Sequence, residues 1–262
     1  MTQSVVVQVG QCGNQVGCRF WDLALREHAH VNKRGLYDEA LSSFFRNVDS
    51  RYVKPAVLVD MEEGVVNQIL QGPLREVFDS TQLLTDVSGS GNNWAVGNMT
   101  YGSAYREKIV DKLRKAAEQC DCLQCFFLIH SMGGGTGSGL GTRVLSLLEE
   151  EFPEVCRIIT SIYPSAEDDV ITSPYNSVLA MNKLTEHADC VLLVENQSLV
   201  DIVNKIKIMS HGTKPGLIIK RNSTVTSGQG GLSGAEKPFD AMNNIVANLL
   251  LNITSESAKV RA

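Results

Sequence analysis

The sequence has no excess of basic residues and no long apolar run. Its 262 residues carry 24 Lys and Arg against 29 Asp and Glu, a formal charge of −5, so it has no positive field to attract nucleic acid. No stretch approaches the ~20 apolar residues of a membrane span, and the amino terminus lacks the pattern of a signal peptide. We therefore expect a soluble, cytoplasmic protein with no nucleic-acid partner and no membrane partner.

The seven cysteines lack the spacing of a disulfide framework or a zinc site. In the cytosol they should be reduced thiols. The cluster Cys120, Cys122 and Cys125 has neither a second Cys-x-x-Cys pair nor a His pair, which leaves a metal site there as a minor alternative. No Ser/His/Asp or Cys/His spacing indicates a nucleophilic enzyme either. With 43 % hydrophobic and 20 % charged residues, the composition predicts a folded domain.

What the sequence does contain is a glycine loop between a strand and a helix. Apolar residues at 125–129 precede the stretch 133–139, in which five of the seven residues are glycine, and apolar residues at helical spacing follow. Glycines let backbone N–H groups converge, and the helix start adds unpaired amides, so phosphate is the expected ligand. The loop has neither the Walker A lysine nor the G-x-G-x-x-G spacing of dinucleotide sites. A flexible connector is the alternative interpretation, although connectors rarely separate a buried strand from its helix.

A second strand-to-helix turn stands at the amino terminus. The apolar strand Ser4–Val9 runs through Gly10 and Gly13 directly into an amphipathic helix. In a parallel sheet all strand carboxyl ends share one edge, so both glycine turns can meet one ligand. Taken alone, however, Gly10 and Gly13 could be ordinary turn glycines.

Carboxylates follow another predicted buried strand, 56–59. Asp60 and Glu62 are spaced to offer oxygens to Mg²⁺, which would offset phosphate charge in the absence of a lysine. A solvated acidic turn would give the same pattern.

Later segments continue the alternation of strands and helices. Residues 88–97 form a loop of small and amide residues in which Trp94 is expected to be a packing anchor, and a helix should run from about 103 to 119. After the strand 157–163, Ser173 is expected to cap a helix with Pro174 at its first position.

The last part of the sequence predicts one more strand, a loop and a helix. A strand at 190–194 leads to Asn196, which could read a base edge or simply end the strand. Residues 210–237 are rich in Gly, Ser and Lys and are expected to form a mobile loop. A helix with a broad apolar face follows from 238 and should pack against something large.

Four motifs together resemble those of the tubulin family. They are GQCGNQ at 10–15, VDMEEG at 59–64, GSGNNWAVG at 89–97 and GGGTGSG at 133–139. The resemblance runs from Met1 to about Thr254, and the segments EHADC, CDCLQCFF and PFDAMNNIVANLLLN are most similar to the epsilon branch of the family. It implies a Rossmann-like, doubly wound α/β fold, with a mainly parallel sheet and helices on both faces, as a GTP-binding domain over 1–254; residues 255–262 would be a divergent tail.

By matching positions, the resemblance also implies which residues contact GTP. They are Gln11, Cys12, Asp60, Glu62, Asn92, Gly134, Gly135, Thr136, Gly137, Asp169, Asn196, Phe239 and Asn243. The first two would line the phosphates and the base side, the two carboxylates would act around Mg²⁺, and Asn92 would reach the γ-phosphate. Residues 134–137 would cradle the phosphates.

The ribose and base would lie further along the sheet edge. Asp169 would approach the ribose, and Asn196 and Asn243 would hydrogen-bond guanine. Phe239 stands where the family has a tyrosine stacked on the base, so stacking could persist without the hydroxyl. Ser173 replaces a glutamate, which implies a weaker ribose contact, and 210–237 is longer than in the family.

The resemblance implies a cytoskeletal assembly protein that works with other tubulins and centriolar or microtubule proteins at the centrosome. Tubulins continue beyond the point where this sequence stops, so we expect a truncated product with little GTP hydrolysis, a GTPase at most within an assembly. One alternative is a nucleotide-cofactor enzyme on a similar sheet, which would need the missing dinucleotide spacing. Another is a truncated product that binds nothing because its apolar surface is uncovered.

Overall fold

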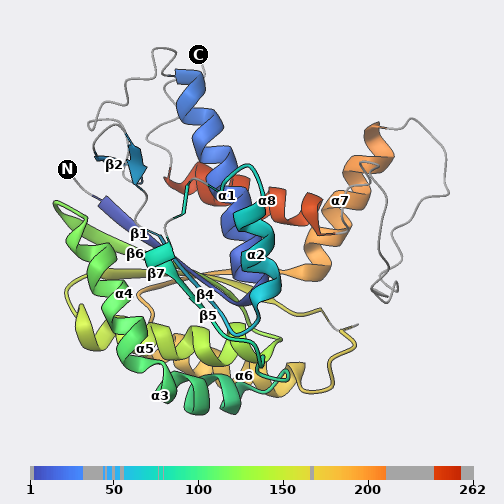
Figure 1. Cartoon of the computed structure of the whole chain (residues 1–262). Coiled ribbons are helices and arrows are strands. Elements are labelled where there is room, and N and C mark those ends of the chain that lie inside the picture. The colour runs from blue at the N-terminus through green and yellow to red at the C-terminus, as the bar shows by residue number, and fades with distance from the viewer. Residues whose placement is uncertain are drawn as a thin grey trace.

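The computed structural model describes residues 3–31, 44, 46–48, 51–53, 56–75, 77–78, 80–165, 168–210 and 239–254. These residues form a six-stranded parallel sheet with helices on both faces (Figure 1), together with a two-stranded antiparallel ribbon. The expected Rossmann-like, doubly wound α/β fold is therefore confirmed. Of the loop expected at 210–237 only residue 210 lies within the described residues, and the tail at 255–262 lies outside them.

The order of the strands places a topological switch point in the middle of the sheet. From one edge to the other the sheet contains β5 (Leu83–Thr85), β4 (Ala56–Asp60), β1 (Gln3–Val9), β6 (Leu123–Ser131), β7 (Cys156–Tyr163) and β8 (Cys190–Glu195). The chain runs outward from β1 to β4 and β5, then returns to place β6 on the other side of β1. The loops that follow β1 and β6 therefore diverge and leave a crevice at the carboxyl edge, where such sheets bind ligands.

The helices form one layer on each face of the sheet (Figure 1). One layer contains α1 (Gly10–Val31), α2 (Glu63–Gln71), α7 (Asn196–Ser210) and α8 (Asp240–Thr254). The other contains α3 (Gly102–Ala104), α4 (Arg106–Glu118), α5 (Gly141–Glu151) and α6 (Ser173–His187). Short turns complete the chain, namely η2 (Ser80–Gln82) and the π-helical turns η3 (Val96–Tyr101) and η4 (Thr136–Leu140), while β2 (Arg46–Val48) and β3 (Arg51–Val53) form the ribbon.

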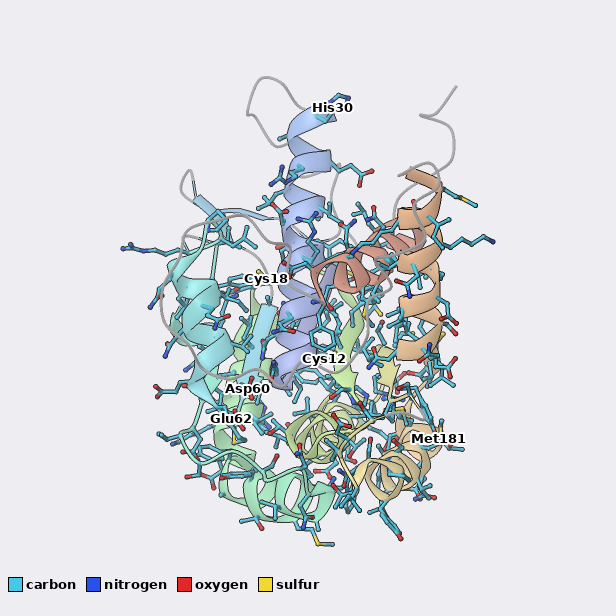
Figure 2. All side chains as sticks on the ribbon, turned by 90° about the vertical axis from the view of Figure 1, so that its right-hand side faces the viewer. Cys12, Cys18, His30, Asp60, Glu62 and Met181 are labelled. Carbon is cyan, nitrogen blue, oxygen red and sulfur yellow. The ribbon has the colours of Figure 1, made fainter. Side chains whose placement is uncertain are left out.

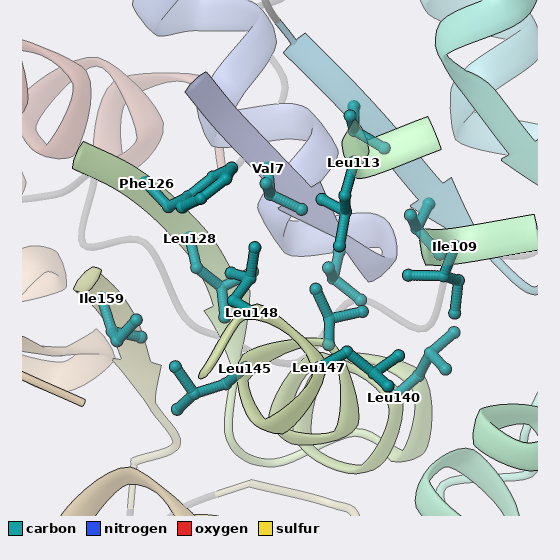
Figure 3. Close-up of a cluster of buried hydrophobic side chains, with 14 of the residues drawn as sticks. Val7, Ile109, Leu113, Phe126, Leu128, Leu140, Leu145, Leu147, Leu148 and Ile159 are labelled. Carbon is teal, nitrogen blue, oxygen red and sulfur yellow. The ribbon is translucent and has the colours of Figure 1, made fainter. Parts of the chain in front are cut away.

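Both faces of the sheet are apolar because helices cover both. In β1 the side chains of Val5 and Val7 join the cluster beneath α4 and α5, whereas Val6 joins the cluster beneath α1 and α8. This is the period of two expected for a strand. Figure 3 shows the first cluster, with Leu113 of α4 and Leu145 of α5 directed toward the strands. Burial on both faces explains why the strands read as nearly continuous apolar runs.

The carboxyl-terminal helix α8 packs against α1, as its broad apolar face predicts. Met242, Val246 and Leu250 are buried in the cluster that also contains Phe20 and Trp21 of α1. The opposite side of α8 remains open, since Leu249 is 41 % exposed and Ile253 49 % exposed. Among the described residues no helix is both long enough and apolar enough to cross a bilayer.

The helix expected from about 103 to 119 is confirmed as α3 and α4, and the π-helical turn η3 precedes it. This turn lets Gly97 pack against the backbone of Gly135 and Leu140, 2.4 and 2.9 Å from where its Cβ would be. The expected cap of α6 was wrong. The cap of α6 is Thr172 rather than Ser173. The Ser173 side chain is 2 % exposed and lies behind Gly133, so it is part of the packing beneath the glycine loop.

Candidate functional site

At the centre of the sheet, β1 passes into α1 without a connecting loop. Gly10 has a φ of 75°, and a Cβ there would be 3.0 Å from the backbone nitrogen of Gly137. The buried Asn14 donates from Nδ2 to the carbonyl oxygens of Gly10 (3.0 Å) and Val59 (3.2 Å). These contacts fix the start of α1 against the glycine loop and against the end of β4.

The glycine loop at 133–139 packs tightly against its neighbours, and two of its glycines, Gly135 and Gly139, pack against the 88–97 loop. A Cβ on Gly139 would be 2.2 Å from the carbonyl oxygen of Trp94, closer than two such atoms approach. Trp94 is 8 % exposed, and its Nε1 donates to Thr142 Oγ1 at 3.2 Å. The prediction that Trp94 is a packing anchor is therefore confirmed.

Gly134 is the exception in this loop. The nearest described atom to a Cβ built on it is Asn92 Oδ1, at 3.8 Å. The backbone of residue 134 thus borders open space, so a ligand could approach it closely.

That space is a cavity of about 620 Å³ at the carboxyl edge of the sheet. The structure brings together all but one of the predicted contact residues there: Gln11, Cys12, Asp60, Glu62, Asn92, Gly134, Gly135, Thr136, Gly137, Asn196, Phe239 and Asn243 line it. Asp169 is not among the described lining residues, whereas its neighbour Asp168 is. The loops identified by sequence thus converge on one place.

Two carboxylates stand at one side of the cavity, next to the start of α1 (Figure 2). Asp60 is 3 % exposed; its Oδ1 accepts a hydrogen bond from the Glu62 backbone at 3.4 Å, and its Oδ2 has no partner among the described residues. Burial raises the pKa of Asp60 to about 6. Glu62 is exposed beside it.

An unpartnered, buried carboxylate oxygen fits a hard cation such as Mg²⁺. No group of three His, Cys, Asp or Glu side chains within the described ranges could hold a metal. Two carboxylates suit Mg²⁺ only when water and phosphate oxygens complete its shell, which is its usual mode of binding.

The described lining contains no Lys, Arg or His side chain. Its positive character comes instead from backbone N–H groups and from the amino ends of α1, η4 and α7, which begin at Gly10, Thr136 and Asn196. An anion held here would therefore meet amide dipoles and carboxylates, so a highly charged one requires a cation in addition.

The other side of the cavity is largely apolar. It is lined by Val16 of α1, Leu199 of α7 and Met242 of α8. Phe239, 50 % exposed, lies at the start of α8, and its carbonyl accepts a hydrogen bond from the backbone nitrogen of Asn243 (2.8 Å). A planar, partly polar group would find both an apolar surface and amide side chains here.

Cys12 contributes a neutral thiol to this lining. Burial raises its pKa to about 12, so the thiolate needed for nucleophilic chemistry is not formed at neutral pH.

Beneath the glycine loop lies the fully buried His130 of β6. Its Nδ1 donates to the carbonyl oxygen of Ser131 (3.1 Å), and its Nε2 accepts from Ser161 Oγ (3.0 Å). Burial lowers its pKa from 6.5 to about 4. The imidazole is therefore neutral at physiological pH and supports the loop without adding charge.

Acidification should destabilise the chain through this histidine. The unfolded chain binds a proton below about pH 6.5, whereas the folded chain resists it until about pH 4, so His130 should remove up to ~3 kcal/mol of unfolding free energy across that window. Urea unfolding at several pH values would measure the unfolding free energy as a function of pH. Between about pH 6.5 and about pH 4, a His130→Gln variant, which does not titrate at this position, should lose less unfolding free energy than the unaltered chain, by up to ~3 kcal/mol. Equal pH dependence in the two chains would contradict the assignment.

Several lining residues were not identified from the sequence. Gly133 belongs to the glycine motif and Ser131 ends the strand before it, so both carried a signal in the sequence. Gln15, Val65 and Gln68 carried none, because they line the cavity only through the placement of α1 and α2. The buried Asn176 of α6 does not line the cavity, but it donates hydrogen bonds to the 88–97 loop and to the glycine loop, and sequence reasoning missed it too. Nothing in the sequence around Asn176 indicated that its side chain bonds to these loops.

Comparison with known proteins identifies the family to which a chain with this fold and cavity belongs. The profile of the Tubulin/FtsZ family, GTPase domain, matches residues 3–204. The chain belongs to this family. The resemblance inferred from the four motifs is thereby confirmed.

Among curated relatives of this tubulin-family chain, similarity is high to tubulin epsilon chains. It is 67 % identical to the tubulin epsilon chain of Homo sapiens and 66 % identical to that of Mus musculus, in each case over 98 % of this chain and 58 % of the relative. It is 39 % identical to the tubulin beta chain of Coprinopsis cinerea over 77 % of this chain and 47 % of the relative. The chain thus spans about half the length of these relatives.

Proposed function

We propose that this chain binds GTP with Mg²⁺ in the crevice at the carboxyl edge of its sheet, as an assembly protein of the tubulin type. The observation that carries the proposal is a cavity in which backbone amides and helix starts face two carboxylates, without any basic side chain in the described lining. That combination suits a phosphate chain that carries its own divalent cation.

The proposed roles follow the geometry of the cavity. Residues 134–137 cradle the phosphates with their backbone, and Gln11 and Asn92 contact them with side-chain amides. Asp60 and Glu62 hold Mg²⁺, directly or through its waters. Because these groups line one continuous cavity, one nucleotide can contact all of them.

The base and ribose occupy the side lined by α7 and α8. Asn196 and Asn243 offer both donors and acceptors for the guanine edge, and Phe239 offers a ring for stacking. For the ribose we propose Asp168 in place of Asp169, because Asp168 lines the cavity.

Slow hydrolysis is part of the proposal. Rapid phosphoryl transfer needs positive charge on the transferring group besides Mg²⁺, commonly from a lysine or arginine. The described lining supplies neither, and the two carboxylates are occupied with the metal ion. We therefore propose that turnover requires groups from an assembled partner.

The assembly role rests on similarity and on the surface. The similarity to tubulin epsilon chains supports a cytoplasmic, cytoskeletal role with other tubulins and centriolar or microtubule proteins, at microtubule-organising centres such as the centrosome and centriole. Near the start of α6, Ile171, Tyr175 and Val178 are 89, 71 and 67 % exposed. Apolar side chains gathered in this way are typical of association surfaces.

Equilibrium dialysis of the purified chain against GTP, with Mg²⁺ or with EDTA, tests the binding. We expect roughly tenfold or greater loss of affinity on Mg²⁺ removal, because the described residues of the lining include no basic side chain to replace the cation. Phosphate release in the same samples should stay far below the ~10 s⁻¹ typical of enzymes. Affinity that is equally high in EDTA, or rapid turnover by the chain alone, would contradict the proposal.

A further inference from the structure

One buried amide connects the two loops on the phosphate side of the cavity. Asn176 of α6 is 3 % exposed. Its Nδ2 donates to the carbonyl oxygens of Asn92 (2.8 Å) and Gly133 (2.9 Å), and its Oδ1 accepts from the backbone nitrogen of Trp94 (2.9 Å). The donors and the acceptor of the side chain are thus all engaged with backbone groups of these loops.

The segment that Asn176 holds is the tip of the 88–97 loop. Asn92 has a φ of 52°, the one positive φ of a non-glycine residue in the described part of the chain. A Cβ on the preceding Gly91 would have no described atom within 4 Å, so this tip has little packing of its own. A left-handed backbone costs free energy outside glycine, although less for asparagine than for most residues, so the contacts that hold it fix the conformation of the tip.

The surroundings that hold it belong to the start of α6. The carbonyl oxygen of Asn92 accepts a second hydrogen bond, from Thr172 Oγ1 at 2.7 Å. Thr172 is exposed and Asn176 is buried, so the two donors reach the same oxygen from opposite environments. The position of the Asn92 side chain in the cavity therefore depends on α6.

We propose that Asn176 is a positioning residue that sets the preference of the site for a nucleoside triphosphate over a diphosphate. This inference rests on the proposed function. Asn176 fixes the distance between Asn92 and the glycine loop by bonding to both. A phosphate that touches only the glycine loop does not need that distance to be fixed, whereas a terminal phosphate held between Asn92 and the loop does.

Substitution of Asn176 by Asp gives the sharpest test. The two side chains have the same shape, but the carboxylate has no N–H and places oxygens against the carbonyls of Asn92 and Gly133. The affinity for Mg²⁺–GTP should fall roughly ten- to hundredfold, and the affinity for Mg²⁺–GDP should fall much less. Isothermal titration calorimetry with each nucleotide gives the ratio of the two dissociation constants.

Asn182→Asp provides a matched control on the same helix. Asn182 is exposed, and its Nδ2 donates to Glu186 Oε1 at 2.9 Å, so the change introduces the same charge without contact with either loop. The GTP-to-GDP ratio of this variant should equal that of the unaltered chain. Thermal melts without nucleotide establish that each variant folds.

Thr172→Val keeps the inference testable if Asn176→Asp does not fold. It removes only the exposed hydrogen bond to Asn92, so it should weaken GTP binding selectively, by a smaller factor than Asn176→Asp. Equal losses for GTP and GDP in both variants would overturn the inference and leave Asn176 with a purely structural role. If the unaltered chain binds neither nucleotide, the proposed function fails first, and the inference fails with it.

Discussion

Replacing Asp60 with Asn should weaken Mg²⁺–GTP binding roughly a hundredfold or more while it stabilises the ligand-free chain. The two effects have one cause, since Asp60 is a buried carboxylate whose Oδ2 has no partner among the described residues. Its pKa of about 6, against an ordinary 3.8, means that ionisation at neutral pH costs the ligand-free fold ~3 kcal/mol. Mg²⁺ would remove that cost by coordinating the oxygen.

The sign of the stability effect follows from linkage. The folded chain holds the Asp60 proton up to about pH 6, the unfolded chain only up to about pH 4, so this group destabilises the fold progressively across that interval and fully above it. The asparagine side chain of the variant cannot ionise, although its amide also lacks a full set of partners. We expect a gain in unfolding free energy of ~1 to 2 kcal/mol at about pH 7.5 and almost none at about pH 4.

Glu63→Gln is the matched control for Asp60→Asn. Glu63 is exposed, stands in the same segment and is not among the described residues that line the cavity. The Glu63→Gln variant loses the same charge as Asp60→Asn, so its affinity for Mg²⁺–GTP should change by about threefold at most. If both variants lose affinity equally, net charge rather than coordination by Asp60 explains the binding. If Asp60→Asn binds normally, Asp60 is not a ligand of the metal ion.

The second large effect is expected at Gly134. Its Cβ position has no described neighbour nearer than Asn92 Oδ1 at 3.8 Å, so Gly134→Ala should leave the unfolding free energy within ~1 kcal/mol of that of the unaltered chain. The added methyl group would nevertheless occupy the surface where a phosphate approaches the backbone. GTP affinity should fall roughly a hundredfold, as measured by calorimetry, because the loop amides could no longer reach the phosphate oxygens.

Gly139→Ala in the same loop should show the opposite pattern. Its new methyl group would lie 2.2 Å from the carbonyl oxygen of Trp94, so the two loops must separate and the chain should lose roughly 2 kcal/mol or more of stability. Urea denaturation of both variants separates the two predictions. Loss of stability in Gly134→Ala, or normal GTP binding by it, would contradict the assigned path of the phosphates.

The sequence allowed the fold and the position of the site to be predicted because both depend on local patterns. Apolar strands followed directly by glycines or carboxylates marked the ends of β1, β4 and β6, and a parallel sheet places such ends at one edge. These patterns predicted that the glycine turns and the carboxylates meet at one edge, whereas the individual contacts Gln11 and Gly134, which line the cavity, were implied by the resemblance to the tubulin family.

The remaining details depend on contacts between distant segments. The difference between Asp168 and Asp169 is set by the path of an irregular loop, where no periodicity indicates the direction of a side chain. Asn176 bonds to a carbonyl 84 residues away, and its sequence context is that of any helix. Thr172 rather than Ser173 occupies the N-cap position of α6, without a side-chain cap hydrogen bond, and Ser173 is packed behind Gly133.

The most direct test of the whole account is the identity of whatever the chain retains. The protein would be purified without added nucleotide and then denatured, and the released compounds would be identified by ion-pair chromatography against guanine and adenine standards. We expect guanine nucleotide at about one per chain, since the cavity is formed within this chain. A chain that is empty, and that does not take up GTP when Mg²⁺ is supplied, would show that the fold of the family is present here without its binding function.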